Sequence, residues 1–277
     1  MELTDRSNLK QYFDENGYVV IDTKLDQQVL DSAVSAVSPY FGETGVVPQE
    51  PCFADYGRVQ DAWVLDNAIW KIANSQVVLG ILKELYSVKA RAFQTLNFEK
   101  GTGQATHADS IHFNSEPFGR MCGVWVALED IGPDQGPLRL YPKSNSLSEI
   151  NYPDVGLEAN GKEYSGYLKA IENVISEEGF AEQRATIKKG QAVIWAANTL
   201  HGGAPQNDLN LTRHSQVTHY YLGKPKAWRP SQSESSRGYF TPKRVRNIHG
   251  WEHRLHCYAI KAREIFGIES KQNNSIS

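Results

Sequence analysis

Short segments of β-forming residues, separated by turn residues, make up most of the chain between residues 91 and 222. The segment 121–131 shows this best, because its apolar side chains alternate as expected for the inner and outer faces of a sheet. One face carries Cys122, Val124, Val126 and Leu128, and the other carries Trp125 and Ala127. Such short strands after a helical N-terminal region favour a mainly β fold with peripheral helices. Its core would be a jelly roll, a cupin-like double-stranded β-helix with one mouth open for a site.

The N-terminal part of the chain is expected to be mostly helical. Helices are predicted over residues 7–16, 26–38 and 67–86, with a short strand at Tyr18–Ile21. No internal repeat or linker divides the 277 residues, so the sequence predicts one domain. Its parts are N-terminal helices in 1–90, a jelly-roll core in 91–222 with an insertion at 143–183, and a C-terminal basic loop and helix in 223–277.

Composition excludes several classes of protein. A net charge of -3 argues against general affinity for nucleic acid. The three cysteines are too few and too scattered for a disulfide framework, which indicates a reducing compartment. Neither a signal peptide nor an apolar stretch of membrane-spanning length is visible, so a cytoplasmic protein without a membrane partner is expected. The oligomeric state is left open.

His107 and Asp109 are separated by one residue, after a stretch that reads as strand, turn, strand. If residues 105–109 are extended, the two side chains point to the same face and can reach one ion. His201 ends another short apolar strand and is followed by two glycines. Two histidines and one carboxylate are the ligands of the facial triad of non-haem Fe(II) oxygenases, which leaves coordination positions open for substrates.

Arg213 follows His201 after a connection rich in turn residues, which predicts an antiparallel return toward that histidine. A guanidinium is a permanently charged fork that suits a carboxylate, such as the far carboxylate of 2-oxoglutarate. Ser215 would share a strand face with Arg213 and can donate a second hydrogen bond to the same group.

Several segments together resemble the phytanoyl-CoA dioxygenase family of Fe(II)- and 2-oxoglutarate-dependent oxygenases. The resemblance covers roughly residues 90–222 and rests mainly on FQTLNF at 93–98, HADSIHFNS at 107–115, MCGVWVALEDI at 121–131 and LTRHSQVTHYY at 211–221. It implies iron ligands at His107, Asp109 and His201, and a 2-oxoglutarate clamp at Arg213 and Ser215. Gln94, or otherwise Asn97, would project toward the co-substrate. The expected substrate pocket includes His112, Phe113 and Trp195.

The activity that the resemblance implies is hydroxylation of an unactivated C–H bond of a small molecule, such as a specialised metabolite. The cofactors would be Fe(II), 2-oxoglutarate and O2, with succinate and CO2 as co-products. Desaturation, cyclisation and epimerisation share the same iron ligands and stay open, whereas Asp109 argues against halogenation, because related halogenases replace this carboxylate by a small residue. Hydroxylation of an acyl-CoA and a jelly roll that binds metal without turnover are further alternatives.

Three other features have two interpretations each. The insertion 143–183, with a helix predicted from Tyr167 to Ser176, is either a surface excursion or a lid over the active site. The basic segment 224–246 is either a solvated loop or subunit contact, or a cover over the mouth that favours an anionic substrate. His249, His253 and His256 would fall near one face of a helix as a rival metal site, although Gly250 weakens the start of that helix.

Overall fold

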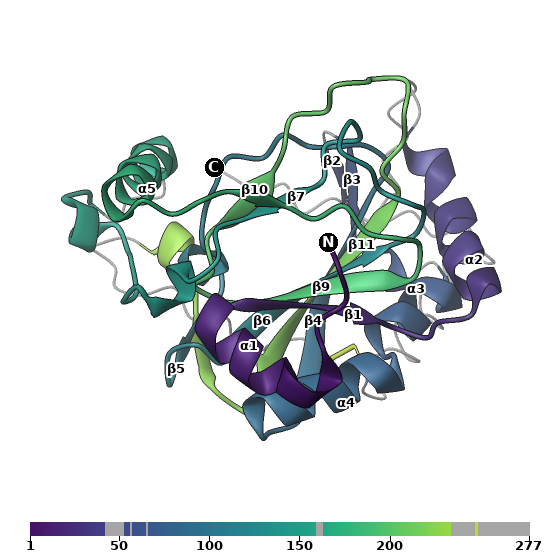
Figure 1. The fold of residues 1–277 in the computed structure, drawn as a ribbon, viewed down its shortest axis with the longest axis horizontal. Helices are drawn as coiled ribbons and strands as arrows, with labels where there is room; N and C mark the ends of the chain where they lie inside the picture. The colour runs from purple at the N-terminus through teal and green to yellow at the C-terminus, as the bar shows by residue number, and fades with distance from the viewer. Residues whose placement is uncertain (42–52, 56, 65, 159–162, 234–246, 249–277) are drawn as a thin grey trace, which may run out of the picture.

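The computed structural model describes residues 1–41, 53–55, 57–64, 66–158, 163–233 and 247–248 (Figure 1). Within these ranges the strands form two main antiparallel sheets. The larger has the order β1 (Tyr18–Asp22), β9 (Gln191–Ala196), β6 (Met121–Ala127), β11 (Ser215–Leu222), β4 (Ala90–Phe98), β3 (Arg58–Gln60) and β2 (Phe53–Asp55). The smaller has the order β10 (His201–Gly203), β7 (Leu138–Leu140) and β8 (Gln183–Arg184). A separate pair joins β12 (Lys226–Trp228) to β5 (Asn114–Glu116).

The α-helices of the described residues are α1 (Leu9–Asn16), α2 (Gln27–Val37), α3 (Asn67–Ala73), α4 (Gln76–Tyr86) and α5 (Tyr164–Glu178). The 3-10 helices are η1 (Arg6–Asn8), η2 (Ser38–Tyr40), η3 (Ala62–Val64), η4 (Asp109–Ile111), η5 (Ser144–Ser146), η6 (Pro153–Val155) and η7 (Pro230–Gln232). None of the described helices is both long and apolar enough to cross a membrane.

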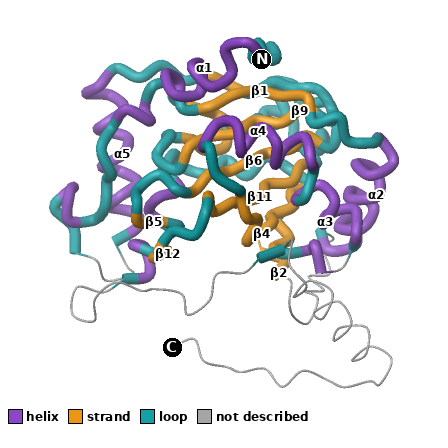
Figure 2. The backbone as a smooth tube through the Cα atoms, turned by 90° about the horizontal axis from the view of Figure 1, so that it is seen from below, coloured by secondary structure: helices purple, strands orange, loops and turns teal. Residues whose placement is uncertain are grey.

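Helices α1 to α4 pack on one face of the large sheet, and the small sheet faces the other (Figures 1 and 2). The alternation predicted for residues 121–131 is confirmed. Cys122, Val124, Val126 and Leu128 belong to the core under the helices, whereas Trp125 and Ala127 belong to the core between the sheets. Two antiparallel sheets packed face to face form the expected jelly-roll core.

The N-terminal region contributes more to the sheet than the sequence suggested. Strand β1 pairs with β9, and β3 pairs with β4, so strands from before residue 91 extend the large sheet at both edges. The sheet therefore does not begin at residue 91, and the expected division between N-terminal helices and core is wrong at this boundary. Strand β1 also brings Tyr18 beside Trp195 on the face toward the small sheet.

The single helix predicted over residues 67–86 is two helices. Helix α3 ends at Ala73, and the Asn74 side chain bonds back to the Trp70 carbonyl oxygen. Ser75 then caps α4, because its hydroxyl accepts a hydrogen bond from the Val78 N–H. Asparagine and serine compete with the helical backbone for hydrogen bonds, and the apolar periodicity on either side of them hid this break. The helix predicted at Tyr167–Ser176 is confirmed as α5, which is longer at both ends.

Candidate active site

His107 and His201 are bonded to each other through their backbones. The His107 N–H donates to the His201 carbonyl oxygen at 2.9 Å, and the His201 N–H donates back to the His107 carbonyl oxygen at 3.0 Å. Glycines after His201 permit this approach, since a Cβ atom on Gly202 would lie 2.7 Å from the Gln104 carbonyl oxygen. The separation of the two histidines is therefore set by the backbone.

The two histidine rings are oriented in the same way. His107 Nδ1 lies 2.9 Å from the Ala105 carbonyl oxygen, and His201 Nδ1 lies 2.9 Å from the Thr199 carbonyl oxygen. A carbonyl oxygen only accepts, so each Nδ1 carries the hydrogen and each Nε2 keeps a lone pair. A hydrogen bond of this kind at the far nitrogen is what orients a metal-binding histidine.

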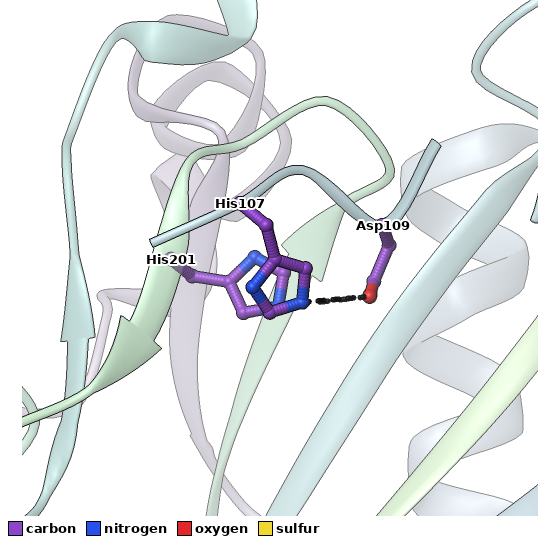
Figure 3. Close-up of side chains that lie close together, drawn as sticks. All are labelled: His107, Asp109 and His201. Carbon is purple, nitrogen blue, oxygen red and sulfur yellow. Dashed lines mark ion pairs between the residues drawn. The ribbon is translucent and has the colours of Figure 1, made fainter. Parts of the chain in front are cut away.

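Asp109 completes the group (Figure 3). Its Oδ1 atom lies 3.8 Å from His107 Nε2 and 3.7 Å from His201 Nε2. Residues 105–109 do not form a full strand as predicted, because the chain turns into the 3-10 helix η4 at Asp109. Ala108 is extended, however, so the two side chains still converge as the HxD spacing predicts. All three ligand atoms lie within 4.8 Å of one another, on buried side chains.

Burial keeps the histidines neutral, and the groups around Asp109 keep its carboxylate ionised. Burial, reinforced by His201, lowers the pKa of His107 to about 4, and burial also lowers the pKa of His201. Burial alone would raise the pKa of Asp109, but the nearby imidazoles of His201, His219 and His107 outweigh it and lower this pKa to about 2. Two neutral imidazoles and one carboxylate are the protonation states that a divalent cation requires.

Arg213 lies in the same cavity and is 3% exposed. One guanidinium nitrogen donates to the Gly136 carbonyl oxygen at 2.9 Å, and the group lies over the rings of Phe98 and Trp125. Its Nε atom has no hydrogen-bond partner within the described residues. Arg213 does not reach His201 through the predicted antiparallel return, because β10 and β11 belong to different sheets. The two residues meet because those sheets face each other.

The other expected co-substrate residues lie in different places. Gln94 lines the cavity, where its side-chain oxygen accepts a hydrogen bond from His219 Nδ1 at 2.8 Å. Asn97 does not line the cavity, because it lies on the opposite face of β4, where it donates to Gln216 at 3.3 Å. Gln216 in turn bonds to the α3 backbone, so this pair ties the sheet to the helices. The alternative role of Asn97 beside the co-substrate is therefore wrong.

Ser215 is buried, and its hydroxyl donates to the Arg213 carbonyl oxygen at 3.2 Å. It therefore contacts the backbone of the arginine in this structure, and its role in the clamp stays a prediction.

His112, Phe113 and Trp195 all line the cavity, as expected for the substrate pocket. His112 Nδ1 lies 3.0 Å from the Ser231 hydroxyl, and its Nε2 lies 3.1 Å from the Tyr164 hydroxyl. Trp195 contacts the iron-ligand candidate directly, since its indole N–H donates to Asp109 Oδ2 at 2.9 Å. The cavity encloses about 250 Å³.

Several cavity residues were not assigned to the pocket from the sequence. His219 is one of them, and its Nε2 atom lies 3.7 Å from Asp109 Oδ2. The remaining unassigned polar and charged residues of the wall are Arg58, Gln60, Thr102, Gln104, Arg229, Ser231 and Gln232. Strand β3 supplies two of these, Arg58 and Gln60, and the segment after β12 supplies three, Arg229, Ser231 and Gln232. Neither segment carries a motif that indicates a place in the cavity wall.

The basic segment 224–246 lies partly within the described residues. Arg229 lines the cavity and its guanidinium lies 5.2 Å from the Phe113 ring centroid, which supports the interpretation of this segment as part of the mouth. Arg237, Lys243 and the rival cluster of His249, His253 and His256 lie outside the described residues.

Comparison with known proteins gives the family of the chain. The profile of the family described as phytanoyl-CoA dioxygenase (PhyH) matches residues 13–214. Phytanoyl-CoA dioxygenase domain-containing protein 1 of Danio rerio is 25% identical over 198 residues, which are 67% of this chain and 62% of that protein. Its homolog in Caenorhabditis elegans is 23% identical over 169 residues, 59% of this chain and 58% of that protein. The chain thus spans less than two thirds of the length of these relatives.

Solved structures share the fold at low sequence identity. The 2-oxoglutarate-dependent epimerase SnoN from nogalamycin biosynthesis superposes with a TM-score of 0.63 at 17% identity, covering 88% of this chain and 95% of SnoN. The carbocyclase SnoK from the same biosynthesis has a TM-score of 0.63 at 15% identity, covering 82% and 87%. EctD from S. alaskensis, crystallised with 2-oxoglutarate and 5-hydroxyectoine, has a TM-score of 0.61 at 14% identity, covering 87% and 84%. The family profile covers most of the sequence, from α1 to the residue after Arg213, and the chain belongs to the phytanoyl-CoA dioxygenase (PhyH) family.

Proposed function

We propose that this protein is an Fe(II)- and 2-oxoglutarate-dependent dioxygenase that hydroxylates an unactivated C–H bond of a small molecule. One observation carries the proposal: the buried group of His107, Asp109 and His201 shares a cavity with Arg213, whose Nε atom has no partner in the described residues. Two imidazoles and a carboxylate suit Fe(II), and an incompletely bonded buried guanidinium suits a carboxylate.

Each residue has a distinct role in this proposal. His107 and His201 would hold iron through Nε2, and Asp109 through Oδ1, the oxygen that faces both rings. Arg213 would bind the far carboxylate of 2-oxoglutarate, and Gln94 lies where it can orient the co-substrate or the His219 ring. Iron supplies activation of dioxygen when it is bound. The side chains of the protein would bind and orient the iron and the co-substrate. They also exclude water from the site, since these ligands and the arginine are at most 4% exposed.

The overall reaction balances without another reductant. One oxygen atom of O2 enters the product as a hydroxyl group, and the other enters succinate. The oxidation of 2-oxoglutarate to succinate and CO2 provides the two electrons that hydroxylation alone does not.

The charges of the cavity wall support an anionic substrate. Among the described residues that line the cavity, Arg58, Arg213 and Arg229 carry positive charge and Asp109 is the only acidic one. The two positive charges of Fe(II) and the two negative charges of 2-oxoglutarate balance each other, so the side chains of the wall decide which sign of charge the site favours in a substrate. A volume of about 250 Å³ supports a small molecule.

Epimerisation or ring closure is the second candidate, favoured by the fold shared with SnoN and SnoK. The two outcomes differ in the product and not in the iron ligands. Hydroxylation adds one oxygen atom to the substrate, ring closure removes two hydrogen atoms, and epimerisation leaves the mass unchanged.

The test is succinate formation from 2-oxoglutarate with Fe(II) and a panel of small organic acids, for wild type and Asp109→Ala. We expect succinate from wild type alone, with label from ¹⁸O2 in both succinate and the hydroxylated product. A wild-type protein that binds iron and 2-oxoglutarate but forms no succinate with any panel member would favour the non-catalytic metal-binding alternative. Labelled succinate with unlabelled product would favour ring closure or epimerisation.

A further inference from the structure

We propose that Trp195, seated against Gly123, is a positioning residue that holds Asp109 as an iron ligand through one oxygen atom only. The inference rests on the proposed function, because it concerns how the iron site is built. It begins from the two oxygen atoms of Asp109, which have different surroundings.

The Oδ1 atom of Asp109 faces the two ligand histidines, and the Oδ2 atom faces away from them toward Trp195. The indole N–H donates to Oδ2 at 2.9 Å, and the carboxylate side chain is 5% exposed. An indole nitrogen is a donor only, and it keeps its hydrogen across the whole range of pH in which the protein is folded. Trp195 therefore occupies one acceptor site of Oδ2, with His219 Nε2 3.7 Å from the same atom, and Oδ1 is the oxygen that faces the two ligand histidines.

Binding through one oxygen matters for this chemistry because coordination positions are limited. A facial triad takes three positions and leaves the others open for substrates. A carboxylate that bound through both oxygens would occupy a position that the co-substrates need. The bond from Trp195 would therefore preserve the open positions as well as fix the orientation of Asp109, in the way that hydrogen bonds to ligating carboxylates tune metal sites.

The position of the indole depends on a glycine on the neighbouring strand. Gly123 on β6 is the register partner of Trp195 on β9. A Cβ atom on Gly123 would lie 2.1 Å from Trp195 Cζ2 and 2.3 Å from its Cε2, far inside any tolerable contact. Trp195 is 2% exposed and its ring centroid lies 4.8 Å from that of His201, so the indole has little room to move aside. Because Gly123 has no side chain, it leaves the space that the Trp195 ring occupies when its N–H donates to Asp109.

The principal variant is Trp195→Phe, which keeps an apolar ring and removes the N–H. Trp63→Phe is the matched control, because the Trp63 indole also donates to a carboxylate, Asp61 Oδ1 at 3.2 Å, away from the cavity wall. The probe is Co²⁺ added to metal-free protein, with the Kd from calorimetry and the coordination from the visible absorption spectrum. Thermal unfolding of the metal-free proteins measures the purely structural cost of each substitution.

We expect Trp195→Phe to raise the Kd for Co²⁺ by roughly 10- to 100-fold and to change the Co²⁺ spectrum, as loss of a hydrogen bond to a metal ligand does. Trp63→Phe should leave both unchanged even if it lowers the Tm equally. A wild-type Kd and spectrum in Trp195→Phe would overturn the inference. Absence of Co²⁺ binding by wild type would instead count against the proposed iron site.

Gly123→Ala tests whether the space beside Gly123 positions the Trp195 indole, with the tryptophan still present. The added Cβ should displace the ring and raise the Kd in the same direction, whereas Gly80→Ala, whose Cβ meets nothing within 4 Å, should not. In the double variant with Trp195→Phe, the Kd should be no higher than in Trp195→Phe alone, because the bond is already lost. A wild-type Kd in Gly123→Ala, or additive effects in the double variant, would overturn the role of Gly123.

Discussion

Arg213 is a buried cation that no carboxylate neutralises within the described residues. Burial lowers its pKa to about 10, which leaves the group charged at neutral pH. A buried charge is costly unless it is paired, and the single side-chain hydrogen bond to Gly136 together with two aromatic faces offsets only part of that cost. An anionic ligand would therefore stabilise this residue, which connects its burial to its proposed role.

The first prediction concerns the affinity for 2-oxoglutarate. Arg213→Gln should weaken binding of 2-oxoglutarate to the Mn²⁺-loaded protein by about 1.5–3 kcal/mol, the range for hydrogen bonds to charged groups, or roughly 10- to 150-fold in Kd. Calorimetric titration measures this change. Arg184→Gln removes a surface arginine that pairs with Glu182, and it should leave the Kd unchanged. Equal affinities for all three proteins would contradict the clamp.

Among single residues, the sequence predicted the metal-ligand candidates well, because only a few residue types can bind a metal ion. The HxD pair and the histidine before two glycines identified three residues that do converge. The hydrogen bonds that orient them were not predictable, because the Nδ1 partners are backbone carbonyl oxygens, which every residue has. Asn97 could have been excluded from the sequence, because it lies three residues after Gln94 in a strand whose register is continuous between them, and strand alternation therefore puts the two side chains on opposite faces.

Helix α5 does not line the cavity itself, but it is linked to residues of the cavity wall. Tyr167 and Ile171 on this helix belong to one buried apolar cluster with Ala108, which precedes Asp109, and Ile111, the last residue of η4. At its first residue, the Tyr164 hydroxyl bonds to His112, which lines the cavity and also bonds to Ser231 of η7. His112 thus joins the insertion and the C-terminal loop at the cavity wall. This arrangement favours the lid interpretation of residues 143–183.

The second prediction tests whether this bond holds α5. Tyr164→Phe should remove about 0.5–1.5 kcal/mol of local stability and so speed amide hydrogen exchange in residues 164–178 by roughly two- to tenfold. Tyr152→Phe is the matched control, since the Tyr152 hydroxyl is buried with no hydrogen-bond partner in the described residues. Mass spectrometry of deuterium uptake measures both. If the two variants exchange alike, the Tyr164 bond does not hold the helix.

Element positions were predictable where periodicity was unbroken, as on β6 and α5. They failed where side-chain capping competes with helical hydrogen bonds, as at Asn74 and Ser75. Strand pairing between distant segments could not be predicted either. Nothing local in Tyr18–Asp22 indicates that this strand pairs with β9, which lies far away in the sequence. Such non-local pairings are a property of the whole sheet.

For the molecule as a whole, the stability in acid depends on four histidines around Asp109, of which His107, His201 and His219 are buried and His112 is partly buried. Burial lowers the pKa of His107 to about 4 and that of His112 to about 3, and it also lowers the pKa values of His201 and His219. In the unfolded chain these groups titrate near 6.5. Between the unfolded and folded values, the unfolded state binds more protons, so the free energy of unfolding falls as the pH falls.

The third prediction is that the free energy of unfolding of the metal-free protein falls as the solution becomes acidic. Stability should be full above pH 6.5 and should decline from there toward pH 4, with each histidine contributing up to about 1.4 kcal/mol per pH unit. Urea unfolding at a series of pH values measures this. His112→Gln should reduce the slope, because one histidine with a lowered pKa is removed. A profile that is flat between pH 6.5 and 5 would contradict neutral burial.

The backbone pairing of His107 with His201 has a consequence for how this fold changes over evolutionary time. Two reciprocal backbone hydrogen bonds join His107 to His201, so the chain between these two residues forms a closed ring. The ring includes α5 and the insertion around it, which reach the cavity wall through Tyr164. Loops inside such a ring can be lengthened, shortened or exchanged while the distance between the histidines stays the same. In the proposed function, the two histidine ligands would therefore keep their separation while the surface loops between them change, and the same iron site could serve different substrates.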